Sequence, residues 1–180
     1  GGHVDIGGVL AHVSASVSTN KGNVIVAGSD GIEFDAGIDA IAQVRGNRIS
    51  AGNDGVHIED RDSGHTTGVD SGATVNILDN DIGSVGSATI GDDGIDFDDS
   101  ITGNSTVTIS GNSIGRSGAK VGDDGIDIDS ITGGATVNIT DNPDIRAADN
   151  GIEISGVVNG GASLTIQGNN HGIHADDHGI

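Results

Sequence analysis

The sequence predicts an all-β solenoid, in which successive turns of chain, each about thirty residues long, stack on one another. Three observations support this fold class. Two short apolar patterns recur along most of the 180 residues, and both alternate with the period of two that is typical of strands. No stretch shows a helical stripe, and 33 glycines are too many for stable helix interiors. One turn with two or three strands cannot bury its own apolar face, so a core requires stacked turns.

The first pattern reads apolar-x-apolar-x-x-Asn and predicts one strand per turn. Its asparagines are separated by 27, 33, 32, 30 and 27 residues, which sets the length of each turn. The pattern occurs at residues 15–20, 42–47, 75–80, 107–112, 137–142 and 164–169.

The second pattern reads Gly-apolar-x-apolar and predicts a second strand per turn. His3 takes the glycine position in the first copy, and residues 178–180 resemble the start of a seventh. A short third strand is expected after each asparagine, as at Asp81-Ile82 and Ser113-Ile114. The copies lie at residues 3–6, 31–34, 55–58, 94–97, 125–128 and 151–154.

The repeated "VxIxxNxI" and "DGIxI" patterns resemble the right-handed parallel β-helix of the pectin-lyase-like superfamily. The resemblance spans residues 4–180 and implies about six rungs, with the asparagine at the tight turn between the second and third strands. Asparagine tolerates the left-handed conformation of a sharp bend, and its amide both donates and accepts hydrogen bonds. The resemblance therefore implies an internal ladder of Asn20, Asn47, Asn80, Asn112, Asn142 and Asn169.

Stacked turns place equivalent outward residues in columns along the axis. On the Gly-apolar-x-apolar strand we name them the acidic column: Asp5, Glu33, His57, Asp96, Asp127 and Glu153. On the strand before the asparagine we name them the neutral column: Ser16, Gln43, Asn76, Thr108, Asn138 and Thr165.

Composition limits the core and the partners. The chain has two phenylalanines and no Tyr, Trp, Met or Cys, so Ile, Val, Ala and Leu must build the core, and neither a disulfide nor a cysteine metal site is available. Its net charge of −20 argues against binding to nucleic acid or to an anionic membrane surface, because like charges repel. The same charge favours cations as partners.

Stacked carboxylates predict a calcium site. Neighbouring rungs lie about 4.8 Å apart, and like charges at that distance repel by roughly 1–3 kcal/mol, which a cation would relieve. Clustered carboxylate oxygens suit Ca²⁺. The predicted ligands are Asp96, Asp98, Asp127 and Asp129, with Asp93 and Asp124 from the preceding turns. The alternative is a solvated acidic face that binds no specific ion.

An enzyme of the pectin-lyase-like class is a further alternative. The "GDD" at 91–93 and 122–124 resembles the paired aspartates of polygalacturonases, but the Gly-His-Gly loop and Arg-x-Lys strand of that branch are absent. The lyase branch needs a basic residue beside calcium, and Arg61, Arg116 and Arg146 have no evident place there. No catalytic residue is therefore assigned.

Three other features carry weaker hypotheses. The tail residues His171, His174 and His178 have spacing that could hold Zn²⁺ or Ni²⁺, or they are exposed histidines at a chain end. Asn104 and Asn138 begin glycosylation triplets. The insertion at 59–72 is either a binding loop or an unconstrained one.

The sequence predicts a single β-helix domain over residues 1–180, belonging to a longer chain or to a protomer that stacks head to tail, because no capping helix is evident at either end. The expected role is structural: a rigid acidic stalk or filament segment at the cell surface or outside the cell. The alternatives are an adhesin module that binds polysaccharide or a host surface, and a lyase or hydrolase of acidic polysaccharide.

Overall fold

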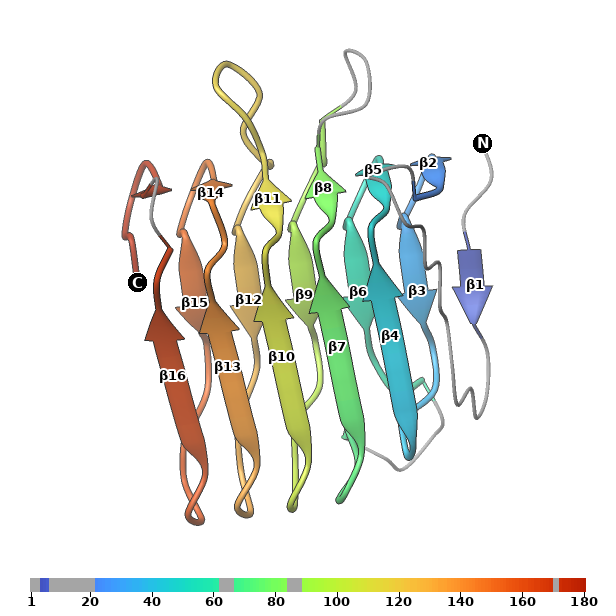
Figure 1. Cartoon of the computed structure of the whole chain (residues 1–180), viewed down its shortest axis with the longest axis vertical. Coiled ribbons are helices and arrows are strands. Elements are labelled where there is room, and N and C mark those ends of the chain that lie inside the picture. The colour runs from blue at the N-terminus through green and yellow to red at the C-terminus, as the bar shows by residue number, and fades with distance from the viewer. Residues whose placement is uncertain (1–3, 7–21, 62–66, 84–88, 170–171) are drawn as a thin grey trace.

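The computed structural model is a parallel β-solenoid, and it describes residues 4–6, 22–61, 67–83, 89–169 and 172–180. All seventeen described strands belong to three parallel sheets, which confirms the predicted fold class (Figure 1). The structure describes slightly fewer complete turns of three strands than the six rungs expected from the sequence. Among the described residues, no helix is long and apolar enough to cross a lipid bilayer.

Each sheet takes one strand from each successive turn, and Figure 1 shows the strands side by side in chain order. The first sheet contains β1 (Val4–Ile6), β3 (Ile32–Phe34), β6 (Val56–Ile58), β9 (Ile95–Phe97), β12 (Ile126–Ile128) and β15 (Ile152–Ile154). The second contains β4 (Ile41–Arg45), β7 (Thr74–Leu78), β10 (Thr106–Ser110), β13 (Thr136–Thr140) and β16 (Ser163–Gln167). The third contains β2 (Val24–Val26), β5 (Arg48–Ser50), β8 (Asp81–Ile82), β11 (Ser113–Ile114), β14 (Asp144–Arg146) and β17 (Ile173–His174).

The core is a stack of aliphatic side chains from all three sheets. Ile95, Ile109 and Ile114, one from each strand of the same turn, are fully buried. Both phenylalanines, Phe34 and Phe97, lie inside the first sheet and are at most 2% exposed. The alternation of buried and partly exposed residues in β7, β10 and β13 is the period-two pattern of the sequence.

The asparagines between the second and third sheets form the expected hydrogen-bonded ladder. The Oδ1 atom of Asn112 accepts from the backbone N–H of Asn80 at 3.0 Å and from its Nδ2 at 2.9 Å. Asn112 Nδ2 in turn donates to the carbonyl oxygen of Ile77 at 2.8 Å. The ladder joins Asn47, Asn80, Asn112, Asn142 and Asn169.

The first described member of the asparagine ladder is Asn23, whose Nδ2 donates to Asn47 Oδ1 at 3.2 Å. The predicted member Asn20 lies outside the described residues. Asn23 fits this place because β2 pairs with β5, with Val24 opposite Arg48. Asn23 and Asn47 therefore both come directly before their strands.

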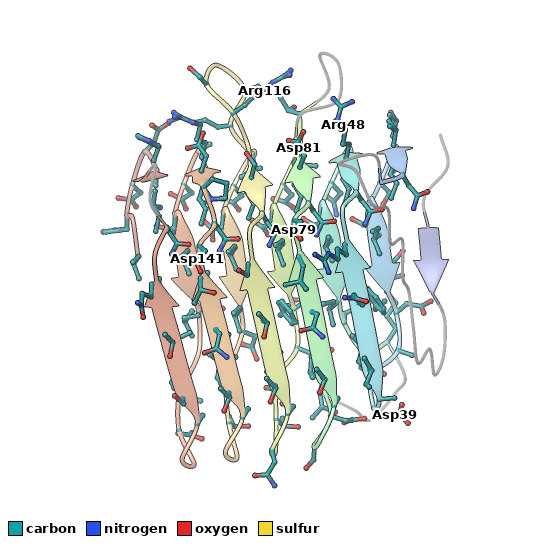
Figure 2. All side chains as sticks on the ribbon, in the orientation of Figure 1. Asp39, Arg48, Asp79, Asp81, Arg116 and Asp141 are labelled. Carbon is teal, nitrogen blue, oxygen red and sulfur yellow. The ribbon has the colours of Figure 1, made fainter. Side chains whose placement is uncertain are left out.

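The sharp bend lies one residue earlier than the sequence suggested. The left-handed residue of each turn precedes the asparagine, as at Asp79 (φ 55°), Gly111 (φ 69°) and Asp141 (φ 56°). Asp79 and Asp141 follow the ends of β7 and β13 (Figure 2). The expectation that asparagine itself takes this conformation is wrong, because its amide serves the ladder while its neighbour makes the bend.

The glycine that opens each strand of the first sheet is required by close packing. A Cβ on Gly94 would lie 2.3 Å from Cγ2 of Ile114 and 2.5 Å from the carbonyl oxygen of Gly125. Gly55 and Gly125 meet the same kinds of neighbour at similar distances. The "GI" repeat therefore marks where the first sheet begins, against the isoleucine of the third.

Candidate functional site

The acidic column forms along the outward side of the first sheet. Strand register pairs Asp5 with Glu33, Glu33 with His57 and His57 with Asp96. Asp96 is paired with Asp127, and Asp127 with Glu153. The parallel pairing of equivalent residues thus brings carboxylates, and one imidazole, together from successive turns.

Much of the acidic column is shielded from water. Glu33, His57 and Asp96 are each less than 9% exposed, whereas Asp127 and Glu153 are half-buried. Burial raises the pKa of Asp96 to about 9, with further contributions from the charges of Asp54 and Asp93. Burial also raises the pKa of Asp127. The middle of this column is therefore not the freely solvated face that the sequence left open.

A second polar ladder lies beside the acidic column, in the turn before each strand. The Oδ1 atom of Asp93 accepts from the backbone N–H of Asp124 at 2.7 Å. Asp54 accepts in the same way from Asp93 at 2.9 Å. We name this set the aspartate ladder: Asp30, Asp54, Asp93, Asp124 and the asparagine Asn150.

Sequence reasoning missed the aspartate ladder, although a signal was available. Aspartate, or asparagine in one turn, precedes every described glycine that opens a strand of the first sheet. The predicted metal ligands Asp93 and Asp124 both belong to this ladder, where one oxygen of each is used by the backbone of the next turn. Their other oxygen remains the one that could reach a cation.

Three carboxylates of the aspartate ladder are weaker acids than an ordinary aspartate. Burial raises the pKa of Asp93 to about 8, and the hydrogen bond from the Asp124 backbone only partly opposes this. Burial raises the pKa of Asp54 and that of Asp124 to about 6. Asp93 therefore holds a proton at neutral pH unless a cation replaces it, whereas Asp54 and Asp124 bind protons in mildly acidic solution.

His57 lies among carboxylates from three turns. Its Nε2 is 3.3 Å from Asp96 Oδ2, and its Nδ1 is 3.8 Å from Asp54 Oδ2 and 4.0 Å from Glu59 Oε1. None of these contacts has the geometry of a hydrogen bond, so both ring nitrogens lack a hydrogen-bond partner among the described residues. The sequence placed His57 in the acidic column without assigning it a role.

Arg61 reaches the acidic column. Its Nη1 lies 2.7 Å from Glu33 Oε1, and its Nε contacts Glu59 Oε1. The expectation that Arg61 has no place beside the carboxylates is wrong. Arg61 lies only two residues after Glu59 in the chain, so its side chain reaches back to the acidic column. Arg146 instead pairs with Asp144 at 2.7 Å, in the third sheet.

The structure gathers some of the predicted calcium ligands and separates others. Asp93 and Asp96 form a group with Asp54, in which one oxygen of each lies within 4.8 Å of the others. In two further groups, Asp123 joins Asp92 and Asp93, and also Asp124 and Asp149. Among the described residues, three predicted ligands enter no such group: Asp98, Asp127 and Asp129.

The two described tail histidines contact different residues. His174 Nε2 lies 4.0 Å from Asp144, while His178 Nδ1 lies 3.3 Å from Asn150 Oδ1. His171 lies outside the described residues, as do residues 62–66 of the insertion. In the part of the chain that is described, no tail histidine belongs to a group of three metal-binding side chains.

Chemically, the arrangement offers two kinds of donor set. The turn carboxylates around Asp123 supply oxygen alone, and they are more exposed than the acidic column. The set around His57 combines imidazole nitrogen with carboxylate oxygen and is buried. Comparison of the chain with protein-family models, curated proteins and solved structures finds no match.

Proposed function

We propose that this chain is a rigid acidic segment of a stalk or fibre, located at the cell surface or outside the cell, and that Ca²⁺ increases its stability. We also propose that its fold is the right-handed β-helix of the pectin-lyase-like class. Backbone hydrogen bonds of all three sheets run along one axis, which makes the segment stiff. Self-association by head-to-tail stacking would extend the same hydrogen bonding between copies.

The observation that carries the proposal is a pair of aspartate clusters, both of which contain Asp123. Asp92, Asp93 and Asp123 lie within 4.8 Å of one another, and Asp123 also approaches Asp124 and Asp149. Burial raises the pKa of Asp123, and the charges of the neighbouring carboxylates raise it further. Ca²⁺ takes six to eight oxygens in flexible geometry, so it can neutralise several of these groups and hold adjacent turns together.

Thermal unfolding tests the role of calcium. We expect millimolar Ca²⁺ to raise the melting temperature relative to EDTA, and to do so more than Na⁺ at equal ionic strength. Asp123→Asn should reduce this increase by at least half, because Asp123 belongs to both carboxylate groups. Asp39→Asn is the matched control, since Asp39 is an exposed acid at the far edge of the turns (Figure 2).

Two results would remove calcium from the proposal. One is an equal melting temperature in Ca²⁺ and in EDTA. The other is an identical loss of the Ca²⁺ effect in Asp123→Asn and Asp39→Asn, which would indicate screening of the net charge of −20 rather than a site. Electron microscopy at increasing protein concentration would test self-stacking, with elongated particles expected.

The second sheet favours an adhesin role as a second candidate. Outward side chains on β7, β10, β13 and β16 are all uncharged, although the chain as a whole is strongly acidic. Most are hydroxyls and amides, such as Thr106, Thr108 and Asn138, in register from strand to strand. Such a regular array suits the hydroxyls of a neutral polysaccharide.

A glycan-binding screen with wild-type protein and Thr108→Lys tests this candidate. The lysine would stand at the centre of the array and should abolish retention on any neutral glycan that binds. Asp39→Lys adds the same charge away from the sheet and should leave retention unchanged. Absence of binding to neutral glycans at millimolar concentration would eliminate the adhesin role through this face.

A further inference from the structure

The geometry points to a second metal site, outside the carboxylate clusters that contain Asp123, in which His57 and Asp96 bind a divalent first-row transition metal such as Zn²⁺. Asp54 and Asp93 each place a carboxylate oxygen within 4.8 Å of one of Asp96. The proposal does not depend on calcium binding at Asp123.

The first argument is the unsatisfied imidazole. His57 is 8% exposed, and both of its ring nitrogens lack a hydrogen-bond partner among the described residues. A buried polar atom without a partner costs free energy of about 1–3 kcal/mol. A metal ion bound at Nε2 would remove this cost at the nitrogen that faces Asp96.

The second argument is the spacing of the two principal donors. His57 Nε2 and Asp96 Oδ2 are 3.3 Å apart. Zinc binds histidine nitrogen at about 2.0–2.1 Å and carboxylate oxygen at about 2.0–2.2 Å, so two ligands of a tetrahedral ion lie about 3.4 Å apart. The two atoms therefore already stand at the separation that a shared zinc ion requires.

The third argument is the orientation of the ring. A metal-bound histidine usually directs its other nitrogen toward a carboxylate, which fixes the tautomer. His57 Nδ1 faces Asp54 Oδ2 at 3.8 Å and Glu59 Oε1 at 4.0 Å. The imidazole is thus flanked by carboxylates on both sides, with Nε2 left for the ion.

The fourth argument is the distribution of positive charge. Arg61 neutralises Glu33 and Glu59, on one side of His57. On the other side, no described Lys or Arg forms an ion pair with Asp54, Asp93 or Asp96. A divalent cation at His57 would supply the missing charge where the buried carboxylates of Asp54 and Asp96 meet the half-buried carboxylate of Asp93.

The nature of the donors selects the class of metal. Ca²⁺ and Mg²⁺ prefer oxygen alone, whereas imidazole together with carboxylate suits Zn²⁺, Ni²⁺ and Co²⁺. The His57 site should therefore discriminate against Ca²⁺. This preference separates it from the site proposed at Asp123.

Cobalt titration tests the site, because Co²⁺ reports its ligands through its visible absorption. The starting protein carries His171→Asn, His174→Asn and His178→Asn, so that the tail cannot bind metal. We expect this protein to bind one equivalent of Co²⁺ with a ligand-field band, and Zn²⁺ to displace it. Millimolar Ca²⁺ should not displace it.

Two variants in that background assign the ligands. His57→Asn and Asp96→Asn should each weaken Co²⁺ binding by at least about tenfold, as expected when a metal ligand is removed. Asp39→Asn should bind Co²⁺ like the starting protein. A circular dichroism spectrum of His57→Asn that matches the starting protein would show that the variant is folded, and any Ca²⁺ effect on melting temperature should be retained because the two sites are separate.

A measurement without a substitution at the site covers the case in which both variants unfold. Imidazole nitrogen chemical shifts of the ¹⁵N-labelled starting protein should show Nε2 of one histidine shifting on addition of one equivalent of Zn²⁺. Failure to bind Co²⁺, a band that persists in His57→Asn, or no change in any imidazole nitrogen would each overturn the proposal.

Discussion

The asparagine ladder shows how one residue type can set the spacing of turns. From Asn80 to Asn169, each Oδ1 accepts from the main-chain N–H and the side-chain amide of the asparagine one turn earlier, as at Asn112 and Asn80. Asn112 is fully buried, so losing its amide would leave several polar groups without partners. The ladder therefore fixes register as well as contributing stability.

Asn112→Ala should lower the free energy of unfolding by about 2–4 kcal/mol, because it leaves Asn80 donors unsatisfied in the interior. Urea denaturation monitored by circular dichroism would measure the change. Asn138→Ala, on the outward face of β13, is the matched control and should cost less than about 0.5 kcal/mol. Equal effects of the two substitutions would contradict the ladder.

From Asn47 to Asn169, the residue before each ladder asparagine alternates between glycine and aspartate, and the structure gives a steric reason. A Cβ on Gly111 would lie 2.5 Å from Asp79 Oδ1, and one on Gly168 would lie 2.2 Å from Asp141 Oδ1. The carboxylate of one turn therefore occupies the space that a side chain of the next would need. Neither the alternation nor its cause was inferred from the sequence.

Gly111→Ala should be destabilising by about 1–2 kcal/mol, since alanine disfavours the left-handed conformation and also meets Asp79. Asp79→Gly in the same chain should recover the steric part, which a double-mutant cycle in urea would reveal as a favourable coupling. Additive effects of the two substitutions would show that the carboxylate does not restrict residue 111.

At the scale of the element, each turn depends on contact between the glycine that opens one strand and the isoleucine of another sheet. Strand positions and facing were predictable from the sequence because the period-two pattern of Ile95 and Phe97 is unambiguous. The contact of Gly94 with Ile114 was not predictable, because it depends on how the third sheet closes the turn.

Gly94→Ala should destabilise the protein by about 1–3 kcal/mol through overpacking against Ile114. Gly28→Ala is the control, because a Cβ there would meet nothing within 4 Å. Ile114→Leu in the Gly94→Ala chain should restore part of the loss, because leucine lacks the Cγ2 methyl group that the new Cβ would meet. Melting temperatures of the four proteins would decide, and equal values for Gly94→Ala and Gly28→Ala would contradict the packing.

At the scale of the whole molecule, the repetition of one turn explains both the stability of the fold and the repulsion between its stacked carboxylates. The sequence repeat predicted the acidic column because stacking makes neighbours of Asp96 and Asp127. It did not reveal that Asp54, Asp93 and Asp124 serve backbone hydrogen bonds, since aspartate before glycine is common in turns. Nor could spacing alone show which carboxylates converge, because the turns bring Asp54 and Asp93 to Asp96, whereas Asp98 joins no such group among the described residues.

Burial of these carboxylates makes stability depend on pH. An unfolded aspartate has a pKa near 3.9, whereas the folded chain raises the pKa of Asp96 to about 9 and that of Asp93 to about 8. Between the unfolded pKa and these folded pKa values, the folded chain binds more protons than the unfolded chain. The free energy of unfolding therefore falls as pH rises through this range. The slope approaches about 1.4 kcal/mol per pH unit for each extra proton bound.

Equilibrium unfolding of the full chain from pH 4 to pH 9, once in EDTA and once in millimolar Ca²⁺, tests most directly whether protons and cations compete to neutralise the stacked carboxylates. We predict that in EDTA the free energy of unfolding declines steadily across this range, and that Ca²⁺ restores much of it above pH 7. A flat profile in EDTA, or the same decline in both solutions, would contradict the account.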